Sequence, residues 1–312
     1  MRNFISLLIL STKVAAIGRT LQDCLSVAAM FDNTCSSTST PITFAEHAGS
    51  SMSCVGEMYC PGSTGKYNFN ASNPCKFTRK LCVTCREESG VVKIRVQTNG
   101  LPNHCFQSAL TNAKSINTDW EVNFNPNVSG KINYAAADVD SASKVSSLLC
   151  DIQRTSDVNM IAGTDFKMIQ AKRDLQQMPP AGGMMPGGGT QTVQITTADG
   201  LALSGAYFFN GLNAESKDAV ETEISTLDMC LSHTTPMGQY HYHIWSPCIR
   251  KNKGTWSSST APGSCTSYTS CKSDPYNFGL QEGYSGAYKQ NMEIIGIAKD
   301  GHVMYGPWNA NG

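Results

Sequence analysis

Charged side chains are scarce in this chain of 312 residues: they make up 15% of it, and 24 basic residues balance 24 acidic ones. Because neither a basic stripe nor an acidic block stands out, the charge pattern gives no support to nucleic-acid binding. No stretch after the N-terminus approaches the ~18 to 20 consecutive apolar residues that a membrane-spanning helix needs. We therefore expect no nucleic-acid partner and no membrane span.

Several catalytic motifs are also missing. The sequence has no Gly-x-Ser-x-Gly nucleophile elbow, no His-Glu-x-x-His zinc motif and no phosphate-binding P-loop. A cysteine nucleophile is disfavoured as well, because most thiols of a cysteine-rich chain in an oxidising compartment should be oxidised. We assign no catalytic residue and favour a binding role over an enzymatic one.

Cysteine, by contrast, is abundant. The thirteen cysteines are scattered through the chain, whereas zinc fingers group theirs in paired Cys-x-x-Cys blocks. Scattered cysteines are typical of disulfides and of an oxidising compartment. Two glycosylation sequons, which begin at Asn70 and Asn127, fit the same route. These features predict a disulfide-linked glycoprotein that is secreted, extracellular or held at the cell surface.

The N-terminus agrees with that compartment. Arg2, an apolar run over residues 4–10 and the small residues Ala15 and Ala16 form the pattern of a secretory signal peptide. We place this signal at residues 1–16, and the alternative interpretation is a buried N-terminal helix.

The segment that follows is rich in cysteine and poor in apolar residues. Seven cysteines lie from Cys24 to Cys85, in a composition too polar to bury enough surface without cross-links. We therefore predict a small disulfide-rich module over residues 17–90, with one helical face around residues 21–31. Because seven is odd, one thiol pairs outside the module, pairs with another chain or stays free.

The rest of the chain, residues 91–312, carries strand signals. Apolar and polar residues alternate, or apolar residues run together between turn signals, in a series of short segments. These predicted strands cover residues 92–96, 120–124, 145–154, 192–196, 201–209, 292–298 and 302–305. We predict a mainly β domain, an antiparallel sandwich or barrel-like fold with long loops. Its loops include a Gly/Pro/Met run at residues 177–190 and the stretch at residues 251–274, whereas residues 214–227 form a short helix or a surface excursion.

The chemistry centres on residues 240–243, which read Tyr-His-Tyr-His. On a strand, His241 and His243 point to one face and the two tyrosines to the other. Two neighbouring imidazoles are half of a zinc or copper site. Upstream groups would supply the third ligand: His233, His104 or a carboxylate such as Asp228. The alternative is a pair of structural histidines that are hydrogen-bonded in a polar core.

Some disulfides can be guessed from nearness in the sequence. The guessed pairs are Cys230 with Cys248, Cys265 with Cys271, and Cys105 with Cys150. The first pair would clamp both ends of the histidine segment, but the sequence alone does not fix the connectivity.

Taken together, residues from about 93 to 307 resemble the YHYH domain family. The ordered motifs are Asn-Gly-Leu-Pro-Asn-His at residues 99–104, a Gly-rich apolar strand at 205–211, Cys230 and His233, the tetrapeptide, Cys248, and a Gly-to-Pro motif at 296–307. Leu231 and Ser232 stand where the family tends to have glycine, and the chain ends where the family usually continues.

The resemblance supplies a site but no activity. It links His104, His233, His241 and His243 as motif positions. Our first hypothesis is an extracellular domain that binds copper or zinc through these histidines. The second is a structural or adhesive module in which the histidines and tyrosines are structural or contact a carbohydrate or protein partner. An enzyme that uses the bound metal is the least favoured.

Overall fold

The structure of the protein is a computed structural model that describes residues 17–39, 47–107, 111–126, 167–168, 198–213, 217–249, 259–284 and 293–308. Several predicted features lie outside these residues. They are the signal peptide, the sequon at Asn127, the strands predicted at residues 145–154 and 192–196, the run at residues 177–190, and Cys150.

The N-terminal part contains one helix and two small sheets. Helix α1 (Leu21–Ala28) begins at a capping box in which Thr20 and Asp23 bond each other's backbone N–H, and it buries Cys24 and Val27. Strand β1 (Ser50–Cys54) pairs with β4 (Cys75–Arg79), and β2 (Gly56–Tyr59) pairs with β3 (Lys66–Phe69). The predicted helical face is therefore confirmed, and the other described elements of the segment are strands.

A third sheet follows in the order β5-β6-β7-β8, and all neighbouring strands in it are antiparallel. Its strands are β5 (Leu81–Glu88), β6 (Val91–Thr98), β7 (Thr118–Asn123) and β8 (Lys167–Met168). Strands β6 and β7 confirm the alternating patterns of residues 92–96 and 120–124. The predicted domain boundary at residue 90 falls in the turn between β5 and β6, so paired strands lie on either side of it.

The largest sheet has the order β11-β12-β10-β9-β13-β14. Its strands are β9 (Ala198–Ala202), β10 (Tyr207–Phe209), β11 (Ser232–Thr234), β12 (Tyr240–Tyr242), β13 (Ile294–Ala298) and β14 (Val303–Tyr305). Strands β10 and β12 run parallel, and the other pairs are antiparallel. The sheet is thus mixed, and β13 and β14 confirm the strands predicted at residues 292–298 and 302–305.

The single buried strand predicted at residues 201–209 is wrong. Strands β9 and β10 form a hairpin there, closed by hydrogen bonds from Ala202 N to Ala206 O and from Gly205 N to Ala202 O. The turn itself is buried, with Leu203 and Ala206 6% and 0% exposed. The run of apolar residues therefore continues through the turn. Hydrophobicity alone does not show where the chain reverses direction between β9 and β10.

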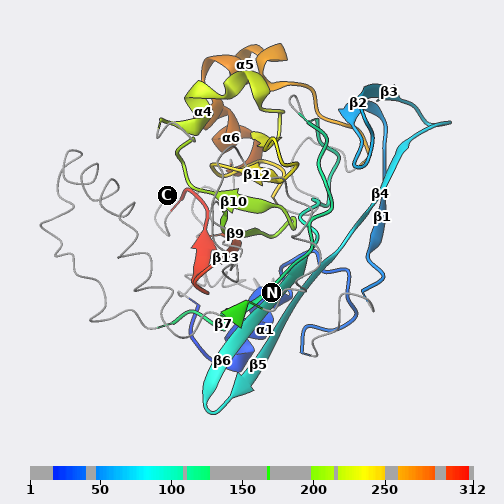
Figure 1. Cartoon of the computed structure of the whole chain (residues 1–312). Helices are drawn as coiled ribbons and strands as arrows, with labels where there is room; N and C mark the ends of the chain where they lie inside the picture. The colour runs from blue at the N-terminus through cyan, green and yellow to red at the C-terminus, as the bar shows by residue number, and fades with distance from the viewer. Residues whose placement is uncertain are drawn as a thin grey trace, which may run out of the picture.

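Short helices cover one end of the molecule. Helix α4 (Ala219–Thr222) and the 3-10 turn η2 (Ile224–Thr226) confirm the helical alternative for residues 214–227. The 3-10 turn η3 (Cys265–Ser267) and α5 (Thr269–Ser273) lie in the predicted loop, and α6 (Pro275–Tyr284) was not predicted. Figure 1 shows α4, α5 and α6 at one end of the molecule and the β5–β6 hairpin at the other.

Six disulfides join the twelve cysteines that the structure describes. They are Cys24–Cys85, Cys35–Cys82, Cys54–Cys105, Cys60–Cys75, Cys230–Cys248 and Cys265–Cys271. The last two confirm the local predictions. The predicted Cys105–Cys150 pair is wrong, because Cys105 bonds Cys54. That bond also explains the odd count, since Cys54 pairs outside the predicted module.

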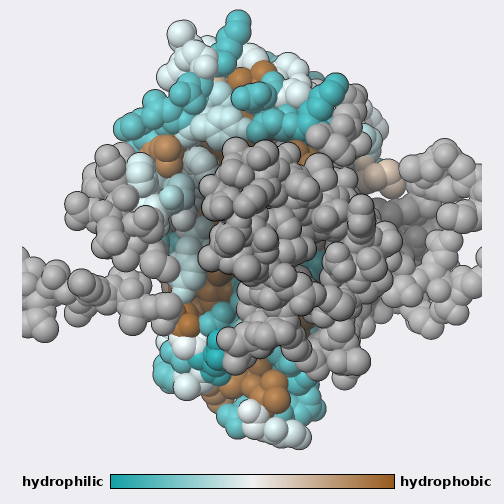
Figure 2. Space-filling view, turned by 90° about the vertical axis from the view of Figure 1, so that its left-hand side faces the viewer, coloured by the Kyte–Doolittle hydropathy of each residue, from teal (hydrophilic) through white to brown (hydrophobic). Residues whose placement is uncertain are grey.

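The main core draws on both predicted parts of the chain. Val27 and Met58 from the N-terminal part are fully buried in the same cluster as Ile94 and Ile297. Hydrophilic residues prevail at the helical end of the face in Figure 2, and apolar residues gather mainly toward the opposite end. Among the described helices, none has the length and apolar character that crossing a bilayer requires.

Candidate metal site

The β11–β12 hairpin brings three histidines to one face of the mixed sheet. His233 on β11 is the register partner of His241 on β12, and directly opposed residues of an antiparallel pair project to the same side. His243 follows β12 and lies two residues from His241, so it shares that side. Strand pairing thus adds His233 to the two histidines that the alternation places together.

The three rings meet through their Nε2 atoms. The Nε2–Nε2 distances are 3.0 Å from His233 to His241, 3.0 Å from His241 to His243 and 3.2 Å from His233 to His243. The ring of Phe209 stacks on that of His241 at a centroid distance of 3.9 Å. His233 and His241 are only 4% and 2% exposed. The three nitrogens form a compact, buried triangle.

The other nitrogen of each ring is held by an oxygen. His241 Nδ1 lies 3.0 Å from Gln239 O, and His243 Nδ1 lies 2.6 Å from Asn210 O. A carbonyl oxygen can only accept, so both Nδ1 atoms carry the proton and donate it. In the neutral rings, the lone pairs of His241 and His243 therefore lie on Nε2, which faces the centre of the triangle.

The Nδ1 atom of the third ring, His233, is also held by an oxygen, here the hydroxyl of Thr226. Thr226 Oγ1 donates to Glu223 O at 2.7 Å, so it is free to accept from His233 Nδ1, which also lies 2.7 Å away. All three lone pairs thus point inward. Metal-binding histidines commonly donate their second N–H in this way, which fixes the tautomer and the ring orientation.

Burial makes the rings of His233 and His241 hard to protonate. Burial, together with the nearby His243, lowers the pKa of His233 to about 3. Burial, with the charges of His233 and His243, holds the pKa of His241 well below its ordinary value. At neutral pH the imidazoles of His233 and His241 are uncharged, which is the form that ligates a metal.

His104, the fourth predicted ligand, does not lie with these three. Its Nδ1 donates to Cys105 O at 2.9 Å, and its Nε2 accepts from the hydroxyl of Tyr242 at 2.8 Å. Tyr242 projects from β12 opposite His241, so His104 lies on the tyrosine side of the strand. Ser204 Oγ, 3.1 Å from the same hydroxyl, completes the chain of hydrogen bonds.

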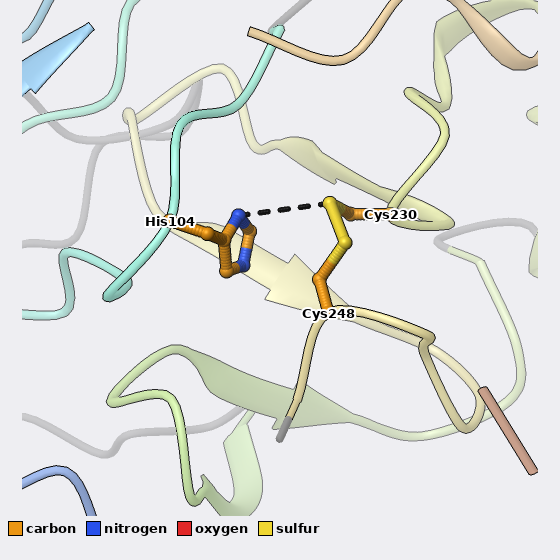
Figure 3. Close-up of side chains that lie close together, drawn as sticks. All are labelled: His104, Cys230 and Cys248. Carbon is orange, nitrogen blue, oxygen red and sulfur yellow. Dashed lines mark hydrogen bonds between the residues drawn. A yellow bond between two sulfur atoms is a disulfide. The ribbon is translucent and has the colours of Figure 1, made fainter. Parts of the chain in front are cut away.

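Two groups of three described side chains bring potential metal ligands close together: His233, His241 and His243, and His104, Cys230 and Cys248. In the second group, His104 Nδ1 lies 3.6 Å from Cys230 Sγ (Figure 3). Cys230 and Cys248 form a disulfide, so neither offers the thiolate that a metal needs. The disulfide clamps the histidine segment, and only the first group offers free ligand atoms.

Asp228, a candidate carboxylate ligand, also lies on the tyrosine side and is fully buried. Its carboxylate accepts four hydrogen bonds, from Gln107 N at 3.0 Å, Cys230 N at 2.9 Å, Ser232 Oγ at 3.1 Å and Tyr240 Oη at 3.1 Å. Burial raises the pKa of Asp228 to about 7, although these hydrogen bonds oppose the rise. Asp228 therefore holds the loops around β11 and β12 together.

Two residues at the site were not predicted, Glu223 and Thr226. Glu223 Oε2 lies 3.5 Å from His233 Nε2 and 3.8 Å from His243 Nε2. Both residues belong to the segment that the sequence assigned to a short helix or surface excursion. Their spacing carries no metal-ligand pattern, and only the hairpin geometry brings them to His233.

The buried, neutral state of His104 predicts a pH-dependent stability. Burial lowers the pKa of His104 to about 4, whereas an unfolded histidine has a pKa of about 6.5. The unfolded chain therefore binds the extra proton between pH 6.5 and 4, and stability falls as the pH falls. From pH 7 to pH 5 we expect His104 to account for a loss of roughly 2 kcal/mol in the free energy of unfolding.

The measurement is urea unfolding of the wild type and the His104→Gln variant at both pH values with a chelator present. Asp228, with its raised pKa, changes stability in the opposite direction over this range, so the difference between the two proteins isolates His104. Equal pH dependence in both would contradict the assignment of a neutral His104.

The comparisons with known proteins concern the C-terminal part of the chain. Residues 178–312 match the family model described as YHYH protein. No curated protein matches the chain, and no solved structure matches it either. The matched residues include His233, His241, His243 and the Cys230–Cys248 disulfide, whereas His104 lies outside them. Residues 178–312, which carry the three-histidine triangle, are therefore the part of the chain that matches the YHYH protein family.

Proposed function

We propose that this is a secreted metal-binding protein that holds a zinc or copper ion through His233, His241 and His243. The observation that carries the proposal is the orientation of the rings. Each Nδ1 donates to a protein oxygen, and each Nε2 presents its lone pair to the same point. Secretion is supported by the disulfides, which persist in oxidising compartments.

The size of the triangle fits an ion of this class. An ion that bonds imidazole nitrogens at about 2.0–2.1 Å in tetrahedral geometry separates two of them by about 3.3 Å. The observed Nε2 separations of 3.0–3.2 Å need only a small expansion. Three protein ligands on a tetrahedral ion leave one position open.

The same geometry disfavours an empty site. Three nitrogen lone pairs that face one another at this distance repel, and a cation at the centre turns the repulsion into attraction. A proton would relieve it less well, because burial opposes a charged imidazole at His233 and His241. The metal-free protein keeps this repulsion, so binding of an ion should also stabilise the fold.

The alternative function, a structural or adhesive module, gives the tetrapeptide a different role. Tyr240 and Tyr242 are 1% and 0% exposed, so they offer no surface to a carbohydrate or protein partner. Under this alternative the histidines are purely structural, and the protein carries no metal.

The test is the metal content of tag-free secreted protein, determined by elemental analysis. We expect one ion per chain in the wild type and after reloading of the chelated protein. The double variant His241→Ala/His243→Ala should bind at least about 100-fold more weakly, because second-shell changes alone cost 10–100-fold. His302→Ala is the matched control, since this histidine contacts Asp300 and Pro126 O outside the triangle. A wild type that takes up neither zinc nor copper would overturn the proposal.

A further inference from the structure

The carboxylate of Glu223 lies beside the three-histidine triangle. Glu223 Oε2 lies within 4 Å of two of the three ligand nitrogens, 3.5 Å from His233 Nε2 and 3.8 Å from His243 Nε2. These separations are close to the ~3.3 Å between two ligand atoms on a tetrahedral ion. The Glu223 side chain is 31% exposed, so a torsion change can bring its oxygen nearer to the centre.

The backbone around Glu223 is tied to the same histidine. Glu223 is the C-cap of α4, and its N–H bonds Ala219 O at 2.9 Å. Its carbonyl oxygen accepts from Thr226 Oγ1, which in turn receives the Nδ1 proton of His233. Residues 223–226 thus bracket the His233 ring, with the Thr226 hydroxyl at Nδ1 and the Glu223 carboxylate at Nε2. This fixed turn sets where the carboxylate can lie.

We propose that Glu223 is the fourth, anionic donor of the metal site and makes it select a divalent ion over monovalent copper. The inference rests on the proposed function, because it assigns the ion class of that same site. Three neutral imidazoles accept both zinc and monovalent copper, so the three histidines alone do not discriminate between these ions.

A carboxylate provides the discrimination in two ways. At a given distance its Coulomb attraction is twice as large for a divalent ion as for a monovalent one. Its hard oxygen also suits borderline divalent ions better than soft monovalent copper, which favours thiolate and thioether ligands. The site is largely buried, so solvent screens this attraction less than it would at the surface.

The experiment compares the affinities of wild type and Glu223→Gln for Zn²⁺ and for Cu⁺. The Cu⁺ titrations are done under anaerobic conditions against a competing chelator. We expect Glu223→Gln to bind Zn²⁺ roughly 100-fold more weakly and Cu⁺ at most about 10-fold more weakly, since the effect of the charge doubles for the divalent ion. Glu223→Asp, which keeps the charge, should recover part of the Zn²⁺ affinity. Cobalt-loaded wild type should show the intense visible bands of a four-coordinate ion, and Glu223→Gln should change them.

The matched control is Glu221→Gln, which removes the same charge from an exposed residue of α4 and should leave both affinities unchanged. Equal losses for the two ions, or no loss for either, would overturn the role of Glu223. A wild type that binds neither ion would instead overturn the metal site itself, so the two failures are distinguishable. Urea unfolding of the metal-free variants checks that their folds are intact.

Discussion

Replacement of Asp228 by alanine is expected to lower the free energy of unfolding by roughly 3–5 kcal/mol. The carboxylate is fully buried and accepts hydrogen bonds from two backbone N–H groups and two hydroxyls. Alanine removes the acceptor of both backbone N–H groups and disrupts the hydrogen bonds of both hydroxyls in a buried site, and it opens a cavity. Urea unfolding of the metal-free protein at neutral pH measures the loss.

The matched control is Asp274→Ala. Asp274 is exposed and accepts one backbone hydrogen bond, from Asn277 N at 2.9 Å. Its loss should cost about 1 kcal/mol, as for other N-cap residues. If the free energy of unfolding falls by the same amount in both variants, the buried hydrogen-bond network of Asp228 stabilises the fold no more than one N-cap residue does.

The Asp228 variant also separates the two sides of β12. Asp228 binds the tyrosine side through Tyr240, whereas the triangle lies on the opposite side. In conditions where the variant is still folded, we expect its metal affinity to change less than that of the histidine variants. Asp228 would then be a structural residue of the hairpin and no ligand.

The sequence predicted the centre of the site because strand geometry is local. Alternation alone places His241 and His243 on one face. His233 joins them because the turn between β11 and β12 is short and fixes the register that sets His233 opposite His241. A hairpin predicted from residues 232–242 would have selected His233 over His104 as the third ligand.

The rest of the site depends on tertiary packing. His104 follows a strand and belongs to a family-like motif, but the sequence does not tell which side of β12 it approaches. Glu223 and Thr226 reach His233 only because α4 and η2 pack beside the hairpin. The Cys54–Cys105 disulfide likewise joins residues that no local pattern connects.

One departure from the family pattern acquires a physical meaning in the structure. Leu231 stands where the resemblance to the family leads us to expect glycine, and its φ is 54°, in the left-handed region that favours glycine. Leu231 is fully buried in the smaller core with Phe278 and Met229. The apolar contacts of the leucine offset the backbone strain, so this chain replaces conformational freedom with packing at the start of β11.

Gly301 is the position where a single methyl group should be most damaging. It lies in the β13–β14 turn with a φ of 91°, and a Cβ there would stand 1.9 Å from Asn123 O. Gly301 O also accepts from Asn125 N at 2.8 Å, so this turn joins the mixed sheet to the end of β7. Alanine would have to separate the two backbones, and we expect Gly301→Ala to destabilise the protein by about 4 kcal/mol or more.

Gly90→Ala isolates the clash from the backbone strain. Gly90 has a similar φ of 77° in the β5–β6 turn, but no heavy atom lies within 4 Å of a Cβ built there. Gly90→Ala should therefore lower the free energy of unfolding by only roughly 1–2 kcal/mol, which is the cost of a residue with a side chain in the left-handed conformation. The measurement is urea unfolding of both variants, or the secreted yield if Gly301→Ala does not accumulate. Similar losses in the two variants would mean that the Asn123 contact relaxes freely. A clearly larger loss in Gly301→Ala than in Gly90→Ala would show that this turn holds the sheet of β7 to the mixed sheet that carries the three histidines.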